Sequence, residues 1–304
     1  MSAGRLIALA VLLAALPGPV VAQAGALDRS PGISGGFTLV GQTTSDDRIT
    51  QELVGSFDFR LRLPLGRLAL AFYVEGNTTP FTDGVSTLVP EANADAGTAL
   101  GRDFAGRVQL SEVRLVVPLG DELEVHGGLV DATGFIDRSV LANDENLVFV
   151  SAPFVNNPTF LFPDYAPGVA MDGLALGSSL RMEAAVTSSN GIAERLAFPN
   201  PDDPDDELDR GIFAAVSATW LDPRYELSVG YWSHTKPVDR LDGAGTGRER
   251  GAFSVLDVVL GDHLLTGRAG WANGNVLPRE GFLGLAYFWG ARDTGGGLGV
   301  SRTG

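Results

Sequence analysis

One short phrase occurs twice in this chain and constrains the fold more than any other feature. The first copy is FRLRLPLGRLALAF at residues 59–72, and the second is VRLVVPLGDELEVHGG at residues 113–128. In each copy an alternating segment runs into Pro-Leu-Gly, turns within a few residues and leaves as a second alternating segment, which is the pattern of a tight β-hairpin. A chain built from such units is predicted to form a β-barrel.

The first copy also indicates how the two faces of the predicted sheet differ. Successive side chains of a strand point to opposite faces, so Phe57, Phe59 and Leu61 share one face, while Asp58 and Arg60 share the other. One face therefore suits lipid and the other suits water. This alternation is typical of a transmembrane β-barrel, whose outward residues are apolar and whose inward residues are polar.

The first residues have the layout of a secretory leader. Arg5 precedes an apolar run over residues 6–16, and a Pro-Gly-Pro break and the small residues 20–22 follow. We therefore predict a signal peptide over residues 1–24 and one porin barrel domain over residues 25–304. An uncleaved anchor is the alternative, but the run is shorter than the ~20 residues that a membrane span needs.

Composition narrows the classes of function. The chain has no cysteine, so disulfides do not stabilise the exported protein. Its 40 glycines in 304 residues are about twice the average share, and their single spacing indicates many turns and bends. The formal net charge of −15 would repel phosphate, which argues against nucleic acid as a partner.

Short turns and long polar stretches alternate along the chain. Besides the two Pro-Leu-Gly turns, short turns are predicted at residues 177–179, 222–224 and 261–263. Short turns on one side and long loops on the other are the porin arrangement. Counting the strand-like segments on either side of these turns, here called arms, gives about 12 to 13 strands. The predicted fold class is all-β, a transmembrane antiparallel barrel of the outer-membrane porin type. The longer polar stretches run over residues 77–104, 131–168, 188–209 and 234–250.

Some strand assignments stay open. The arms at residues 108–117 and 252–260 mix polar and apolar residues on both faces, so their register is uncertain. Aromatic residues near strand ends suit an interfacial girdle, and the alternative is that they fill the core of an ordinary β-sandwich. They are Phe72, Tyr73, Trp220, Tyr225, Tyr231, Trp232, Trp271, Tyr287, Phe288 and Trp289.

Charged residues on the water-facing side are candidates for the lining of a channel, because a channel selects by what lines its narrowest point. Facing rows of arginines and carboxylates would give a transverse field and hydrogen-bond partners for sugar hydroxyls, and the Tyr73 ring could stack on a pyranose. For any single residue, the alternative is that its charge only keeps a wide lumen wet. The candidates are Asp58, Arg60, Arg62, Tyr73, Glu75, Glu112, Arg114, Glu124, Arg181 and Glu183.

The stretch over residues 131–168 is too long for a turn and too apolar for a free loop. Loops of this length inside a compact domain are usually functional. We expect it to fold inwards with a short helical part, to narrow the lumen and to bury its aromatic residues against the wall. The polar residues expected to be exposed in the constriction are Asp137, Asn143, Asp144, Asn156 and Asn157.

The sequence gives little support to an enzyme. His126, His234 and His263 are scattered without metal-ligand spacing. The acidic run at residues 200–209 lacks the glycine and the terminal glutamate of an EF-hand loop, so a solvated outer loop is favoured over a calcium site. We predict no enzyme activity, catalytic residue, metal or cofactor, with a Ser-His-Asp set assembled by the fold as an alternative.

The segment FIDRSVLANDENLVFVSAPFVNNPTFLFPDYAPGVA at residues 135–170 resembles the carbohydrate-selective porin family of the OprB type. The shared features are a Phe-x-Asp step, the Ala-Asn-Asp-Glu run at residues 142–145, and Asn-Asn-Pro followed by Phe-Pro at residues 156–163. A second match is GFLGLAYFWG with DTGGGLGV at residues 281–300. Together with the predicted series of β-hairpins, the resemblance covers most of residues 36–300.

This resemblance implies an outer-membrane barrel of about sixteen strands through which sugars diffuse passively. The implied partners are small sugars, outer-membrane lipids and the barrel assembly machinery, and a homo-oligomer is left open. Residues 148–151 read Val-Phe-Val-Ser where the family tends to have Gln-Phe-Leu-Asn, and the chain stops at Gly304 where family members continue to an aromatic end. The barrel is therefore expected to be C-terminally incomplete.

We therefore predict a sugar-preferring diffusion channel in the cell outer membrane. The main alternative is a soluble exported β-sandwich that binds carbohydrate without transporting it. An outer-membrane barrel enzyme is a weaker alternative.

Overall fold

The computed structural model describes residues 8–12, 31–97, 99–100, 104–141, 149, 151–174, 179–191, 211–290 and 295–304. These residues form mainly β-strands, with a few short helical turns, and no helix among them is long and apolar enough to cross a membrane. The short helices are α1 (Val85–Leu88) and α2 (Ala152–Val155), with single 3-10 turns η1 (Pro90–Ala92), η2 (Asp95–Gly97) and η3 (Ala132–Gly134). The strands are β1 (Ala8–Leu12), β2 (Gly32–Thr44), β3 (Glu52–Leu65), β4 (Leu68–Asn77), β5 (Val108–Pro118), β6 (Leu123–Val130), β7 (Ala166–Leu174), β8 (Leu180–Ser188), β9 (Ile212–Asp222), β10 (Tyr225–Asp239), β11 (Thr246–Leu260), β12 (His263–Ala272), β13 (Gly281–Trp289) and β14 (Gly296–Thr303).

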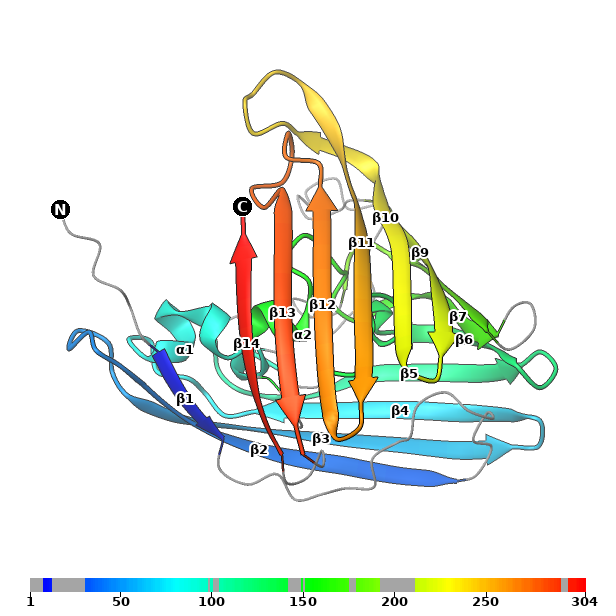
Figure 1. The fold of residues 1–304 in the computed structure, drawn as a ribbon, viewed down its shortest axis with the longest axis horizontal. Helices are drawn as coiled ribbons and strands as arrows, with labels where there is room; N and C mark the ends of the chain where they lie inside the picture. The colour runs from blue at the N-terminus through cyan, green and yellow to red at the C-terminus, as the bar shows by residue number, and fades with distance from the viewer. Residues whose placement is uncertain are drawn as a thin grey trace.

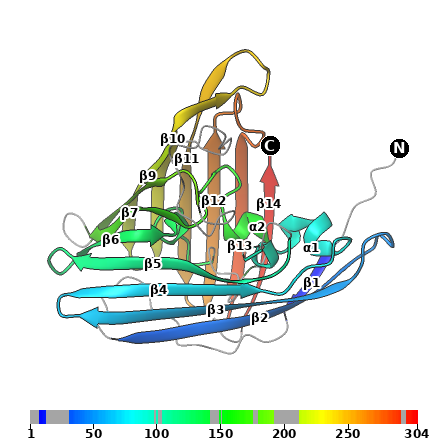
Figure 2. The same ribbon diagram turned by 180° about the vertical axis from the view of Figure 1, so that it is seen from behind.

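The strands form one curved antiparallel sheet. Each strand pairs with its neighbours in chain order, from β1 to β14. Strands β2 to β5 run across the strands β11 to β14, so that the sheet curls around an interior (Figure 1). The opposite view shows α1 and α2 on the concave side (Figure 2). Among the described residues no pairing joins β14 to β1 or β2, so the wall is open there.

This arrangement confirms the predicted porin-type antiparallel sheet and contradicts the β-sandwich, which would need two packed sheets. Thirteen of the fourteen strands follow the predicted leader, in agreement with the estimate of about 12 to 13. Strand β1 lies inside the predicted leader and pairs with β2. Residues 1–7 and 13–30 lie outside the described residues, so the signal peptide stays a prediction.

The turns lie largely where the sequence indicated. Two-residue turns join β3 to β4 at Gly66, β9 to β10 at Pro223 and β11 to β12 at Gly261. Gly66 and Gly120 have φ angles of 66° and 82°, a left-handed conformation that glycine adopts at little cost. Residues 175–178 of the turn between β7 and β8 lie outside the described residues.

One predicted loop is wrong. Residues 234–250 were expected to form a long polar loop, but β10 and β11 extend through most of this stretch and leave only residues 240–245 between them. The pair continues past a register shift between Ser233 and Pro237 as an extended hairpin (Figure 1). The polar residues of this stretch therefore lie mostly on two paired strands and not in an irregular loop.

The polarity of the sheet is inverted relative to a soluble protein. On β3 the side chains of Leu53 and Phe59 are 58% and 40% exposed on the outer face, while Ser56 and Asp58 are 4% and 5% exposed on the inner face. The outer face of β13 is apolar as well, since Leu283 and the other odd-numbered residues up to Trp289 are exposed, whereas its inner face carries the apolar residues Phe282, Ala286 and Phe288. Apolar side chains thus face outwards, and many polar side chains face inwards.

A β-bulge explains why the arm at residues 108–117 could not be assigned. The partners on β4 and β5 step from Tyr73–Glu112 to Val74–Leu110, so Ser111 is an extra residue. An extra residue reverses which face the following side chains take. Ser111 and Glu112 are accordingly both buried, and the polar residues before and after the bulge share the inner face.

The arm at residues 252–260 has regular pairing, but part of its inner face is apolar. Phe253 and Val255 on β11 are buried, whereas Asp257, two residues further along, is polar and also inward. The apolar pair belongs to a buried cluster with Phe135, Ile136 and other residues of the segment over residues 131–165. The inner face is therefore apolar where this segment covers it.

The aromatic residues near strand ends divide between the two faces. Trp232 and Phe288 are buried on the inner face, and Tyr73 joins them there. An aromatic girdle is therefore wrong for these three residues, because each packs against the interior. The aromatic residues exposed on the outer face are Trp220, Tyr225, Tyr231, Trp271, Tyr287 and Trp289.

A charge on the outer face tests whether that face lies in lipid. Leu285 on β13 is 49% exposed, and Leu241 in the 240–245 connection is 61% exposed. We expect Leu285→Arg to destabilise the folded protein by about 2–4 kcal/mol in lipid bilayers, because a charge at the bilayer midplane loses its hydration. Leu241→Arg is the matched control, and surface substitutions in water usually change stability by less than about 0.5 kcal/mol. Urea unfolding in vesicles measures both, and equal small changes would contradict a lipid-facing β13.

Candidate functional site

The ten candidate lining residues occupy inward positions of the strands. Arg60 on β3 pairs with Tyr73 on β4, and Tyr73 pairs in turn with Glu112 on β5. Asp58 and Glu75 form the neighbouring pair. Most of the set is buried, while Arg62 and Arg114 are half-buried and Arg60 is exposed. Inward alternation therefore brings them to one face.

The wall from β3 to β6 carries a row of paired charges. Nη2 of Arg62 lies 2.9 Å from Oε1 of Glu124, and Nη2 of Arg114 lies 3.4 Å from Oε2 of Glu112. Nε2 of His126 lies 3.6 Å from the other oxygen of Glu124. Glu112 and Arg114 stand two positions apart on β5, as do Glu124 and His126 on β6, whereas the Arg62 side chain on β3 reaches Glu124 across β4 and β5.

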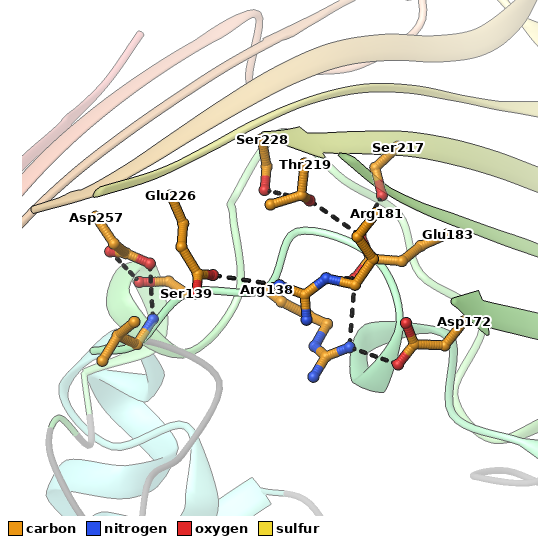
Figure 3. Close-up of polar contacts among 11 residues, drawn as sticks. Arg138, Ser139, Asp172, Arg181, Glu183, Ser217, Thr219, Glu226, Ser228 and Asp257 are labelled. Carbon is orange, nitrogen blue, oxygen red and sulfur yellow. Dashed lines mark hydrogen bonds and ion pairs between the residues drawn. The ribbon is translucent and has the colours of Figure 1, made fainter. Parts of the chain in front are cut away.

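A second charged group lies where the inward segment meets β7 to β10 (Figure 3). Nη1 of Arg138, from the segment, lies 2.9 Å from Asp172 and 3.3 Å from Glu183. Arg181 contacts Glu183 at 3.5 Å and Glu226 at 3.3 Å. Here two arginines share three carboxylates, and the candidates Arg181 and Glu183 are joined by residues that the sequence analysis had not selected.

The described parts of the stretch over residues 131–168 that precede β7 (residues 131–141, 149 and 151–165) fold inwards, and part of the predicted role of this segment needs correction. Its aromatic residues Phe135, Phe154 and Phe160 are buried, as expected, and Asn156 is exposed. Asp137 and Asn157, however, are each only 1% exposed. Their predicted exposure is wrong because both bind the wall: Asp137 pairs with Arg268, and Nδ2 of Asn157 donates to the carbonyl of Ala269 at 3.3 Å. The candidates Asn143 and Asp144 lie outside the described residues.

A cavity of about 410 Å³ opens between this segment, the β3–β4 wall and the connection that holds η2. Four carboxylates line it, together with Arg60 and aromatic rings. The Arg60 guanidinium lies over the Tyr73 ring at 4.1 Å from its centroid, and the Tyr73 hydroxyl donates to Asp58 at 2.5 Å. The carboxylates are Glu75, Asp95, Asp131 and Asp164, and the rings are Tyr73, Phe162 and Tyr165.

Burial and nearby negative charges raise the pKa values of carboxyl groups that line this cavity. Burial raises the pKa of Asp164 to about 7, and the nearby carboxylates of Asp131 and Glu75 raise it further, against the charge of Arg107. Burial also raises the pKa of Asp95 to about 6, although the Ser56 hydroxyl that donates to it acts in the opposite direction. The pKa of Asp131 is raised by burial and by Glu112. The cavity therefore gains negative charge as the pH rises from about 5 to 8.

The arrangement suits reversible binding of a polyhydroxylated solute. Carboxylates and hydroxyls offer hydrogen bonds, and aromatic faces offer stacking surfaces. Among the described residues no three His, Cys, Asp or Glu side chains are placed to hold a metal ion. The sequence Gly32-Ile33-Ser34-Gly35-Gly36 has G-x-S-x-G spacing, but it lies within β2 and lacks the strand-to-helix turn of a nucleophile elbow.

Several residues of this site were missed by the sequence analysis. Glu226 and Asp172 follow the inward alternation of β10 and β7, so a complete count of inward positions would have found them. Asp95 and Asp164 lie outside the strands and carry no periodic signal. Their position depends on how two long connections fold into the interior, which strand alternation does not encode.

Comparisons with known proteins show which proteins this chain is similar to. No family model matches the chain. An uncharacterized protein of Aquifex aeolicus (strain VF5) is 40% identical over 48 residues, which cover 16% of this chain and 16% of that protein. A high-pH structure of OprB from Pseudomonas putida superposes with a TM-score of 0.66 at 12% identity, over 90% of this chain and 74% of that chain. The fold is that of a porin. A mutant of the Rh. blastica porin gives a TM-score of 0.41 at 13% identity, over 98% and 85% of the two chains.

The raised pKa of Asp164 predicts a pH-dependent effect of its replacement. The folded protein holds a proton on Asp164 up to about pH 7, whereas an unfolded aspartate loses it near 3.8. Stability therefore falls as the pH rises between these values, because the unfolded state binds fewer protons. We expect Asp164→Asn to relieve this penalty, so that its stability relative to the native chain is about 1–2 kcal/mol higher at pH 8 than at pH 5.

Thermal or urea unfolding at the two pH values measures this difference. Asp242→Asn is the control, because Asp242 is exposed and its pKa is lowered by the Ala244 amide and Arg240, so its effect is expected to be equal at pH 5 and pH 8. Equal effects of Asp164→Asn at both pH values would contradict the raised pKa.

Proposed function

We propose that this protein is an outer-membrane channel through which small solutes diffuse passively, with a preference for carbohydrates. The observation that carries the proposal is the inverted polarity of the sheet. Leu53 and Phe59 face outwards, while Ser56 and Asp58 on the same strand face inwards. A soluble protein would lose stability by exposing such a continuous apolar face to water, whereas a lipid bilayer favours it.

The outer face has about the height of a bilayer core. His263 pairs with Trp289 at one end of the β12–β13 pair, and Trp271 pairs with Gly281 at the other. The eight residue steps from one pair to the other span about 26 Å along the strands at ~3.3 Å per residue, close to the ~25 Å apolar band of outer-membrane barrels. Aromatic residues at both ends suit the lipid headgroup region. The predicted leader supports export, and the proposed partners are outer-membrane lipids and the barrel assembly machinery.

Two features support the preference for carbohydrates. The first is the sequence resemblance of residues 135–170 to carbohydrate-selective porins. The second is the cavity, in which the rings of Tyr73 and Tyr165 stand beside the carboxylates of Glu75, Asp131 and Asp164. Aromatic faces beside hydrogen-bonding groups fit the apolar faces and hydroxyls of a pyranose. The general channel does not depend on this cavity, but the preference does.

Swelling of liposomes that contain the purified protein tests both levels of the proposal. We expect glucose to enter several-fold faster than a short poly(ethylene glycol) of similar mass. Tyr73→Leu should reduce this preference, because ring contacts contribute about 0.5–1.5 kcal/mol. Tyr231→Leu, which changes an outward-facing tyrosine, is the matched control and should keep the preference.

The outcomes separate the two levels. Equal rates for both solutes would leave a general pore and contradict the preference for carbohydrates. Liposomes that do not swell with either solute, while the protein is inserted and folded, would contradict the channel itself.

A further inference from the structure

Arg268 joins the inward segment to the opposite wall. It stands on β12 and is 2% exposed, and its Nη2 donates to the carboxylate of Asp137, which is 1% exposed. Its Nη1 donates to the carbonyl of Phe154 at 3.0 Å. Asp137 and Phe154 belong to a segment that begins after β6 and returns to β7. One arginine therefore binds two points of a segment whose ends lie on another part of the sheet.

The backbone conformation of Asp137 also indicates that the segment is held in one position at this residue. Its φ angle is 63°, in the left-handed region that non-glycine residues adopt only at a cost. A buried carboxylate also needs a charged partner to offset its lost hydration. The ion pair with Arg268 supplies that partner, and it holds the backbone in a conformation that the segment alone would disfavour.

The segment also lies directly against the backbone of β12. Nδ2 of Asn157 donates to the Ala269 carbonyl at 3.3 Å. A Cβ atom built on Gly270 would lie 2.5 Å from Oδ1 of Asn157, which is closer than real Cβ contacts. Position 270 therefore accommodates only glycine, because the segment occupies the space that a larger side chain would need.

A second anchor lies one strand away on β11. Asp257 accepts hydrogen bonds from the Ser139 hydroxyl at 2.9 Å and from the Val140 amide at 2.8 Å (Figure 3). The Thr266 hydroxyl donates to the same carboxylate at 2.5 Å. The described parts of the segment thus extend from the ends of β6 and β7 to β11 and β12, where hydrogen bonds with Asp257 and Arg268 hold them.

We propose that Arg268 is a positioning residue that sets the free cross-section of the channel, by holding Asp137 and the Phe154 carbonyl against the β11–β12 wall. This inference rests on the proposed channel function. When the contact is lost, the segment withdraws towards its own ends on β6 and β7. A gap then opens between the segment and β12, so the channel conducts more ions and admits larger solutes.

Single-channel recordings in planar bilayers test the role of Arg268. We expect Arg268→Gln and Asp137→Asn each to raise the conductance in KCl about twofold and to increase open-channel noise, since conductance follows the width of the narrowest part. The control is Arg240→Gln, which removes a more exposed ion pair of 2.7 Å between Arg240 and Asp242 and should leave the conductance unchanged. A shift in gel mobility on boiling shows that each variant is folded as a barrel.

A conservative replacement distinguishes loss of the ion pair from a general loosening of the barrel. Arg268→Lys keeps a positive charge beside Asp137, whereas Arg268→Met keeps a long side chain without the charge. We expect folded Arg268→Lys channels to conduct close to the native value and folded Arg268→Met channels to conduct like Arg268→Gln channels.

Three results would overturn the inference. If folded Arg268→Gln and Asp137→Asn channels conduct like the native channel, Arg268 does not set the cross-section, while the channel proposal stands. If folded Arg268→Lys channels conduct as much as Arg268→Gln channels, the ion pair with Asp137 does not hold the segment in place. A folded native chain that conducts nothing would overturn the channel proposal and this inference with it.

Discussion

Apolar side chains on the outer face of the sheet and charged side chains on its inner face are the constraint on which the rest of this structure depends. In water, the free energy of hydration would favour the opposite arrangement. Strands whose outward residues are Leu53, Phe59 and Leu285 are stable only when that face leaves water. A backbone that leaves water needs each strand paired on both sides, which the antiparallel sheet provides among the described residues everywhere except at its open edge between β14 and the first strands. The fold and its proposed environment therefore follow from one pattern of polarity.

The interior is stabilised by charge pairing and by an apolar cluster under the inward segment. Charges that are removed from water need partners, and Arg62, Arg138 and Arg181 each have a carboxylate within 3.5 Å. The cavity beside the segment differs from this pattern, because carboxylates are in excess there and burial raises the pKa values of Asp95 and Asp164. The cavity therefore changes its charge near neutral pH. Solute selection, as proposed here, depends on the cavity and on the width that the segment leaves open.

Much of the fold could be predicted from local sequence, because hairpins and alternation are local properties. The turns at Gly66 and Gly120 and the inward position of Asp58 follow from a few neighbouring residues. The bulge at Ser111 was not predictable, because one extra residue reverses the faces without changing the composition. The burial of Asp137 was not predictable either, since its partner Arg268 is 131 residues away in the sequence. Local patterns thus indicate the wall, while the site depends on long-range contacts of the connections.

The most direct test of the central claim is the environment of the outer face in membranes. Because the chain has no cysteine, a nitroxide can be attached at single positions along β13, and its collisions with lipid-soluble oxygen and with a water-soluble nickel complex can be compared in vesicles. We predict that residues 283, 285 and 287 collide mainly with oxygen, and that residues 284 and 286 do not, which gives a period of two. Frequent collisions with nickel at residues 283, 285 and 287 would show that this face lies in water and would contradict the account.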